Sequence, residues 1–296
     1  MKRTSNHSEQ RLFREEVLSF TREICVCAHL TQTRDAQRAC AEMGISVKKR
    51  VRLTVAYDGT NYHGWQLQEN GNTIEAELNR ALTGLLGEEI QVIGASRTDA
   101  GVHALGNIAV FDTENRMPAE KISYALNQRL PEDIRIQKSE EVLPDWHPRH
   151  VSSKKTYEYR IYRGEFPMPI NRLYAYFVYR PLDVEKMRQA ATYLVGEHDF
   201  KSFCQTGAQV ESTVRRIYGI EIEEQGADLV IRVCGGGFLY NMVRIIAGTL
   251  LEVGMGKREP ESMQDVLKVC NRTAAGPTAP AHGLLLVKYE FDTVFR

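Results

Sequence analysis

The order of strands and helices that the sequence predicts occurs twice, and this repeat limits the fold more than any other feature. Strands are expected where β-branched residues alternate with polar ones, and helices where apolar residues recur every three to four positions. The first half then contains strand 51–57, helix 74–85, strands 90–95 and 107–113, a helix from Pro118, and strand 133–142. Asn72 and Glu75 have the spacing of a capping box for the first helix. The order β-α-β-β-α-β is typical of a split βαβ unit.

The second half repeats the order without repeating the sequence. It contains strand 155–162, a helix capped by Asp183, two strands within 214–234, helix 237–253, a short helix from Pro260, and strand 283–291. We therefore expect an α+β fold of two ferredoxin-like or RRM-like halves, with one continuous and mainly antiparallel sheet. Two such halves side by side leave a central cleft, which is a common place for an active site.

Residues 1–49 lie outside the repeated order. They are polar, have weak periodicity and end at a basic run, Lys48-Lys49-Arg50. We interpret this segment as an N-terminal extension that is poorly ordered, with Met43 as an alternative translation start. The rest divides into an N-terminal lobe, 50–150, and a C-terminal lobe, 151–296.

Composition is typical of a globular protein, with 43% hydrophobic and 26% charged residues. No apolar run approaches the ~20 residues of a membrane helix, and no secretory signal begins the chain, so we expect a cytoplasmic protein without a membrane partner. The six cysteines include no CxxC pair, and the Cys25–Cys27 spacing does not suit zinc. We therefore expect no metal site.

The stretch ASRTDAGVHALG, residues 95–106, connects the second and third predicted strands. A turn by itself explains Asp99, which can bond nearby backbone N–H groups, and Gly101, which can adopt positive φ. A turn does not need Arg97 beside the aspartate, and a cation there helps to keep a carboxylate ionised as a nucleophile. Both interpretations stay open on these residues alone.

Two further loops carry candidate functions. DGTNYHGWQ (58–66) is either a turn or a lid or support loop near a pocket. Three glycines, 235–237, precede the helix 237–253 and could form a phosphate-binding nest at its N-terminus. On that helix Arg244 is flanked by apolar residues, so we expect it to be partly buried and paired with a carboxylate.

Formal net charge is zero, but residues 147–163, HPRHVSSKKTYEYRIYR, are locally basic. They carry five Lys or Arg against one Glu, with tyrosines and histidines interleaved. Such a run is either a solvated face or a surface that meets phosphates and bases. Lys155 belongs to this run and is a candidate for substrate binding.

Six stretches together resemble the TruA-type tRNA pseudouridine synthases. They are AYDGTNYHGWQ (56–66), SRTDAGVHALG (96–106), KTYEYRI (155–161), GEHDFKSF (196–203), GGGFLYNMVRIIAGTL (235–250) and APAHGL (279–284). The resemblance spans 50–296 in the family's order and leaves 1–49 outside it.

The resemblance implies a role for each matched residue. Asp99 corresponds to the catalytic nucleophile, and Arg97 to the arginine that helps to flip the target nucleotide or hold its phosphate. Tyr157 corresponds to the tyrosine that stacks on the target uracil and assists proton removal, and Arg244 to the arginine that pairs with the nucleophile. Positions of tRNA contact correspond to residues 207–211 and to Trp146, His147, Arg149 and His150.

The family converts uridine to pseudouridine at positions 38, 39 and 40 of the anticodon stem-loop and works as a homodimer. The reaction is redox-neutral and adds no group, so we expect no cofactor and no metal. An aspartate could attack either C1′ of the ribose or C6 of the uracil, and the sequence does not choose between these routes.

Two other function classes are compatible with parts of the sequence. A non-catalytic RNA-binding protein of two RRM-like halves explains the fold and the basic stretch, but gives no reason for Asp99 and Arg244. A hydrolase or transferase of free nucleosides explains the carboxylate, but not the extended set of tRNA-contact candidates.

Overall fold

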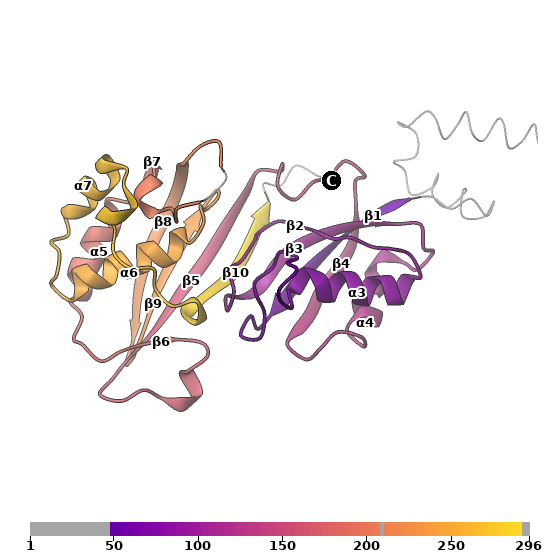
Figure 1. The fold of residues 1–296 in the computed structure, drawn as a ribbon, viewed down its shortest axis with the longest axis horizontal. Coiled ribbons are helices and arrows are strands. Elements are labelled where there is room, and N and C mark those ends of the chain that lie inside the picture. The colour runs from indigo at the N-terminus through magenta and orange to yellow at the C-terminus, as the bar shows by residue number, and fades with distance from the viewer. Residues whose placement is uncertain (1–47, 208–209, 292–296) are drawn as a thin grey trace, which may run out of the picture.

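The computed structural model describes residues 48–207 and 210–291, so most of the predicted extension 1–49, including Met43, lies outside the described residues. Within them, a single ten-stranded sheet has the strand order β4-β1-β3-β10-β5-β9-β8-β7, while β2 pairs with β3 and β6 with β5. Figure 1 shows the strands of the first half on one side of β10 and those of the second half on the other. The fold is therefore mixed α+β, with a large and mainly antiparallel sheet.

The first half follows the predicted order of elements. Its elements are β1 (Lys49–Tyr57), α3 (Ile74–Leu86), β2 (Ile93–Gly94), β3 (His103–Thr113), α4 (Ala119–Leu126) and β4 (Ile134–Val142). Strand β1 lies between β3 and β4 and is antiparallel to both. Alternate residues of β1, from Val51 to Tyr57, are buried, as expected for a strand with one face against a core.

The second half contains more elements. They are β5 (Ser153–Arg163), β6 (Tyr176–Val178), α5 (Val184–Thr192), β7 (Gly196–Asp199), β8 (Val214–Gln225), β9 (Asp228–Gly235), α6 (Met242–Gly254), α7 (Ser262–Val269) and β10 (Leu284–Phe291). Short 3-10 turns occur at Pro169–Asn171, Lys201–Phe203, Arg272–Ala274 and Ala281–Gly283. Strand β10 is antiparallel to β5 and parallel to β3, so the end of the chain joins the two halves.

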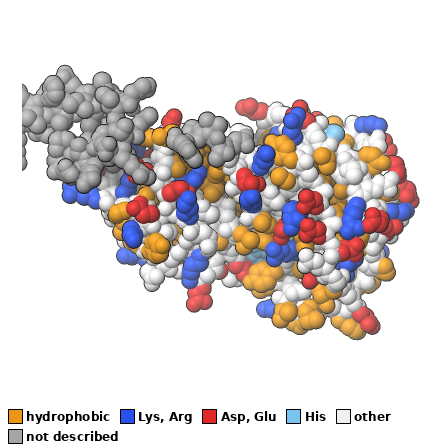
Figure 2. Space-filling view, turned by 180° about the vertical axis from the view of Figure 1, so that it is seen from behind, with side chains coloured by type: hydrophobic (Ala, Val, Ile, Leu, Met, Phe, Trp, Pro, Cys, Tyr) orange, Lys and Arg blue, Asp and Glu red, His pale blue; other side chains and the backbone are white. Residues whose placement is uncertain are grey.

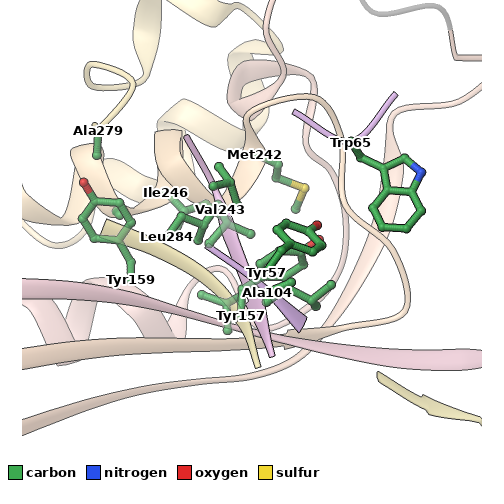
Figure 3. Close-up of a cluster of buried hydrophobic side chains, with 14 of the residues drawn as sticks. Tyr57, Trp65, Ala104, Tyr157, Tyr159, Met242, Val243, Ile246, Ala279 and Leu284 are labelled. Carbon is green, nitrogen blue, oxygen red and sulfur yellow. The ribbon is translucent and has the colours of Figure 1, made fainter. Parts of the chain in front are cut away.

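The core lies between the sheet and the helices. Helices α3 and α4 accompany the first half, and α5, α6 and α7 the second (Figure 1). Figure 3 shows Tyr57, Tyr157 and Tyr159 together with Met242, Val243 and Ile246 of α6. These six side chains belong to one buried hydrophobic cluster, which extends across the junction of the halves.

Three local predictions were wrong: the length of strand 90–95, the N-cap of the first helix, and the start of the helix predicted from residue 237. Strand 90–95 is reduced to Ile93–Gly94, because Asn79 and Thr83 of α3 accept the N–H groups of Val92 and Ile90. The N-cap of α3 is Thr73, which accepts from the N–H of Ala76, instead of Asn72. The Thr73 hydroxyl satisfies one of the first N–H groups of the helix in place of the predicted Asn72 side chain.

Helix α6 begins at Met242, not at residue 237. Its N-cap, Asn241, has φ of 60°, and the backbone between Gly237 and Asn241 is irregular. The three glycines therefore do not stand at the helix N-terminus, and none of them has positive φ. The predicted phosphate-binding nest is not formed, since a nest needs successive N–H groups turned to one point.

Charged side chains of both signs are intermixed on the face shown in Figure 2. Arg232, for example, pairs with Glu158, Glu221 and Glu223. Across residues 48–207 and 210–291, no helix is long and apolar enough to span a membrane. In the same ranges, no three His, Cys, Asp or Glu side chains gather as metal ligands would.

Candidate functional site

A cavity of about 600 Å³ is lined by residues from both halves of the protein. One wall is the loop 95–102, which contains Asp99, and another is the segment 238–243 before and at the start of α6. Lys155 and Tyr157 of β5 and Leu284 of β10 also belong to the lining. Its volume suits a ligand of the size of a nucleotide.

Asp99 lines this cavity, and Arg244, 145 positions further along the sequence, pairs with it from α6. Arg244 Nη1 donates to Asp99 Oδ2 at 3.2 Å, and the two side chains are 16% and 21% exposed. The expected burial and pairing of Arg244 are therefore observed, although Arg244 itself comes from the second half and Asp99 from the first. Both side chains stay partly exposed, and Asp99 is accessible from the cavity.

The Arg244 guanidinium is fixed by two further contacts. Its Nε donates to the carbonyl of Ala279 at 2.8 Å, and its Nη1 donates to Asn241 Oδ1 at 2.8 Å. The backbone N–H of Ala279 in turn donates to the carbonyl of Arg244 at 3.1 Å. Helix α6 and the segment 277–279 thus hold the arginine from two sides, and the aspartate meets a positioned charge.

This arrangement depends on Gly248, one turn further along α6. A Cβ at that position would lie 1.9 Å from the carbonyl oxygen of Pro277. Backbone atoms cannot approach so closely, so any side chain there would push the segment 277–279 away from the helix.

We expect Gly248→Ala to lower the free energy of unfolding by about 1–3 kcal/mol, the range for overpacked cores, and to reduce turnover by displacing Ala279. Gly84→Ala is the matched control, because Gly84 is also helical but its Cβ would meet nothing closer than Arg129 Nη1 at 4.0 Å. That change should leave stability unchanged or raise it by about 0.5–1 kcal/mol. Urea unfolding of both variants checks this, and equal stabilities would contradict it.

Burial raises the pKa of Asp99 above its ordinary value, while the charge and the hydrogen bond of Arg244 lower it. The net direction is upward. Desolvation therefore outweighs the arginine, and removing the arginine would raise the pKa further. A carboxylate that is poorly solvated and ionised is a stronger nucleophile than one in water.

The Asp99 loop, residues 96–102, is supported by the loop 58–66. The backbone N–H of Trp65 donates to the carbonyl of Thr98 at 3.0 Å, and the backbone N–H of Gly101 donates to the carbonyl of Tyr62 at 3.3 Å. Gly64 has φ of +90°, and a Cβ there would lie 2.6 Å from the Thr98 oxygen. Trp65 and Tyr62 are buried, so loop 58–66 acts as a support, although His63 also lines the cavity.

Asn107 also holds the Asp99 loop, and the sequence analysis gave it no role. Its side chain is fully buried; Nδ2 donates to the Ser96 carbonyl at 2.9 Å, and Oδ1 accepts from Ser96 N–H at 3.3 Å. The same amide contacts Tyr57, whose hydroxyl bonds to Thr98 at 2.7 Å. The sequence signal for this role was the single amide in the run NIAVF, because a polar side chain buried among apolar ones needs hydrogen-bond partners.

His103, which the sequence left without a role, joins three segments. Its Nδ1 accepts from the N–H of Gly59 at 3.1 Å, and its Nε2 lies 2.9 Å from the carbonyl of Leu173. Because a carbonyl can only accept, Nε2 carries the proton. The ring is buried and thereby ties the start of β3 to loop 58–66 and to the second half.

We expect His103→Ala to lower the free energy of unfolding by about 1–3 kcal/mol, since it leaves a buried N–H and a buried carbonyl without partners. His63→Ala, at an exposed histidine of the same region, serves as control and should stay within about 0.5 kcal/mol of wild type. Chemical denaturation of the two variants measures both values. A His103 variant as stable as the His63 variant would show that these contacts contribute nothing.

Tyr157 forms part of the cavity wall beside Asp99. Its ring is 8% exposed and packs edge-on against Phe238, with centroids 5.2 Å apart. Burial raises the pKa of its hydroxyl strongly, so the phenol is neutral at physiological pH. The buried hydroxyl of Ser96 lines the same cavity, and its hydrogen bond with Tyr157 opposes this rise in pKa without cancelling it.

Three of the residues predicted to contact RNA are cations that line the cavity, whereas the predicted aromatic contact is enclosed by protein. Arg97, Arg149 and Lys155 line the cavity, and the rings of His147 and His150 stack on each other 4.1 Å apart. Trp146 is 6% exposed and packs in a core cluster with Ala95, Ile108 and Val110. The predicted contact of its side chain with tRNA is therefore corrected, because the indole is enclosed by protein.

The chain was compared with known proteins. The profile of a family described as tRNA pseudouridine synthase matches residues 53–150 and 190–292. A tRNA pseudouridine synthase A from Ruminiclostridium cellulolyticum is 49% identical over 241 residues, which are 81% of this chain and 98% of that protein. One from Bacillus licheniformis is 46% identical over 245 residues, 82% of this chain and 99% of the relative. On these matches, the chain belongs to the tRNA pseudouridine synthase family.

Proposed function

We propose that this protein isomerises uridine to pseudouridine at positions 38, 39 and 40 in the anticodon stem-loop of tRNA, with Asp99 as the nucleophile. Family membership supports the reaction class and the tRNA substrate. The observation that carries the assignment of the site is the ion pair between Arg244 and Asp99, because Asp99 lines the cavity that both halves form. The anticodon position follows from the resemblance of the sequence motifs.

The reaction needs a poorly solvated carboxylate and a place for a uracil ring. In it the N1–C1′ bond breaks, the base turns, and C5 bonds to C1′; C5 loses its proton, and N1 gains one. Asp99 either forms an ester with C1′ or adds to C6, and Arg244 stabilises its charge before attack and after release. The aspartate is regenerated at the end, so the chemistry balances without a redox partner.

Tyr157 is proposed to stack on the uracil that has left the RNA stack. Stacking on an aromatic side chain contributes roughly 1–3 kcal/mol per base and offsets part of the cost of unstacking. Its neutral hydroxyl lines the same cavity as Asp99 and is the proposed relay for the C5 proton, which it accepts as it passes its own phenolic proton on to solvent. Arg97, exposed at the mouth of the cavity, is proposed to take the place or the phosphate of the flipped nucleotide.

The organisation of the protein is part of the proposal. Strand orders β4-β1-β3-β2 and β10-β5-β9-β8 support two ferredoxin-like lobes, 50–150 and 151–296, with the active-site cleft between them. We further propose a cytoplasmic homodimer that binds one tRNA with both subunits. Arg149, His147 and His150 are proposed as RNA contacts beside the cleft.

The proposal is tested by mapping pseudouridine in tRNA transcripts incubated with the purified full chain. A transcript with uridines at 38, 39 and 40 should gain pseudouridine there, and a transcript with cytidines at these positions should gain none. Carbodiimide labelling followed by primer extension locates each product. Modification elsewhere in the tRNA would overturn the assigned positions, and binding without any modification would favour a non-catalytic RNA-binding protein.

A further inference from the structure

A lysine in the wall of the cavity has no counter-ion in the part of the chain that the structure describes. Lys155 lies on β5 two residues before Tyr157, so both side chains face the cavity. Its ammonium group lies 5.1 Å over the ring of Tyr289, its neighbour on β10. Throughout residues 48–207 and 210–291, no carboxylate forms an ion pair with it and no oxygen accepts a hydrogen bond from it.

Arg149 lines the same cavity as Lys155, and the charges of Arg149 and Arg215, from two other elements, both act on the lysine. Arg149, between β4 and β5, donates from Nε to the carbonyl of Gly94 at 2.8 Å. Arg215, on β8, donates to the carbonyls of Ser212 and Val214 at 2.9 and 2.6 Å. Carbonyl partners fix the position of a guanidinium without neutralising its charge. Neither arginine forms an ion pair within the described residues.

The protein does pair its arginines in other places. Arg232 contacts three glutamates, and Arg50 forms two hydrogen bonds with Asp112. Figure 2 likewise shows basic and acidic side chains intermixed over a whole face of the protein. A half-buried lysine between two arginines is costly because desolvation and repulsion both act on it. An anionic ligand would remove both costs.

We propose that Lys155, Arg149 and Arg215 form a subsite for one backbone phosphate of the RNA, adjoining the nucleotide that lies between Asp99 and Tyr157. The inference rests on the proposed function for its ligand, because it takes the anion to be part of an RNA chain. A phosphate presents several acceptor oxygens, which suits donors supplied by three different elements. Its position next to Tyr157 suits a phosphate of the target nucleotide, whose base stacks on that ring.

The subsite should respond to pH through its lysine. Burial, followed by the repulsion of Arg149 and Arg215, lowers the pKa of Lys155 to about 8. Tyr289 on β10 and Gly235 on β9, its other neighbours, add no charge at neutral pH. The free subsite therefore loses one positive charge as pH rises through about 8. A bound phosphate favours the charged form, so RNA affinity should fall over that interval.

The test measures equilibrium binding of an anticodon stem-loop that already contains pseudouridine, so that no turnover occurs. Lys155→Gln should weaken binding at pH 6.5 by about tenfold, the order expected for one charge-assisted contact. It should also reduce the slope of log affinity against log salt by about 0.7. Lys155→Arg should bind like wild type at pH 6.5 and lose the pH dependence up to pH 8.5.

Lys154→Gln is the matched control, because Lys154 is the adjacent exposed lysine and lies over Tyr218, outside the cavity lining. It should leave affinity within about twofold of wild type. Stem-loops with a single neutral methylphosphonate locate the contact. At one position beside the target nucleotide the substitution should weaken binding to wild type and leave binding to Lys155→Gln unchanged.

Two results would overturn the subsite. One is a Lys155→Gln variant with the affinity and salt slope of wild type. The other is a Lys155→Gln variant whose binding is weakened further by every single methylphosphonate, as the binding of wild type is. The outcome is independent of the proposed reaction. A chain that binds the stem-loop through Lys155 but forms no pseudouridine would refute the enzyme and keep the subsite. A chain that forms pseudouridine while Lys155→Gln binds normally would keep the enzyme and refute the subsite.

Discussion

Asp99→Ala is expected to abolish pseudouridine formation, with turnover reduced on the order of 10⁴-fold or more, while tRNA binding is retained. The carboxylate is proposed to form the bond that replaces N1–C1′ or to add to C6 of the uracil, and among the described residues that line the cavity no second carboxylate can take its place. Asp99 is partly exposed to the cavity, so its removal creates no void in the core.

Two measurements separate this loss from misfolding. Liquid chromatography with mass spectrometry of digested tRNA quantifies pseudouridine, and filter binding of the same tRNA measures affinity. Asp99→Asn retains the shape of the side chain and a hydrogen-bond acceptor for Arg244, so it should be folded and equally inactive. An inactive Asp99→Ala that has also lost RNA binding would not distinguish a nucleophile from a structural residue, whereas an inactive, well-bound Asp99→Asn would.

Arg244→Gln is expected to reduce turnover by about 10²–10³-fold and to move the acidic limb of the pH–rate profile to higher pH. The reaction needs the ionised form of Asp99, so the rate falls as pH drops through the pKa of that group. Burial already raises this pKa, and Arg244 is the group that lowers it. Without the arginine, the carboxyl becomes protonated at a higher pH, and the limb shifts accordingly.

The shift is read from kcat against pH for wild type, Arg244→Gln and Arg244→Lys. Lysine retains the positive charge but not the three contacts to Asp99, Asn241 and Ala279, so it should restore most of the limb and only part of the rate. A limb at the wild-type pH in Arg244→Gln would contradict the proposed electrostatic role. Thermal melting of each variant shows whether the loss of the Asn241 and Ala279 contacts destabilises the fold.

Most elements of the fold followed from the local sequence. Alternating residues in 51–57 and in 155–162 predicted β1 and β5, and the turn Gln-Gly-Ala-Asp predicted the hairpin of β8 and β9. The prediction of strand 90–95 was wrong because side chains of α3 accept two of its N–H groups, a tertiary contact that the periodicity of the sequence does not reveal. The glycines 235–237 failed as a helix start because the backbone turns at Asn241, the N-cap with φ of 60°, and α6 begins only at Met242.

The candidate site was predictable to the extent that each residue carries its own signal. An arginine within an apolar helical stretch implied a carboxylate partner, and the structure places Asp99 there. Trp146 carried an ambiguous signal, because an aromatic in a basic stretch can stack on RNA or fill a core, and it fills a core. Asn107 and His103 act through backbone groups of distant segments, so their contacts depend on the folded sheet.

The central claim is that Asp99 carries out the isomerisation in the cavity shared by the two halves. Release of tritium from tRNA containing 5-tritiated uridine tests it most directly, because C5 loses its hydrogen only when the new carbon–carbon bond forms. Under single-turnover conditions, the wild-type chain should release tritium stoichiometrically with its target uridines, and Asp99→Ala should release none above background. Tritium release by Asp99→Ala at a rate near that of wild type would contradict the account.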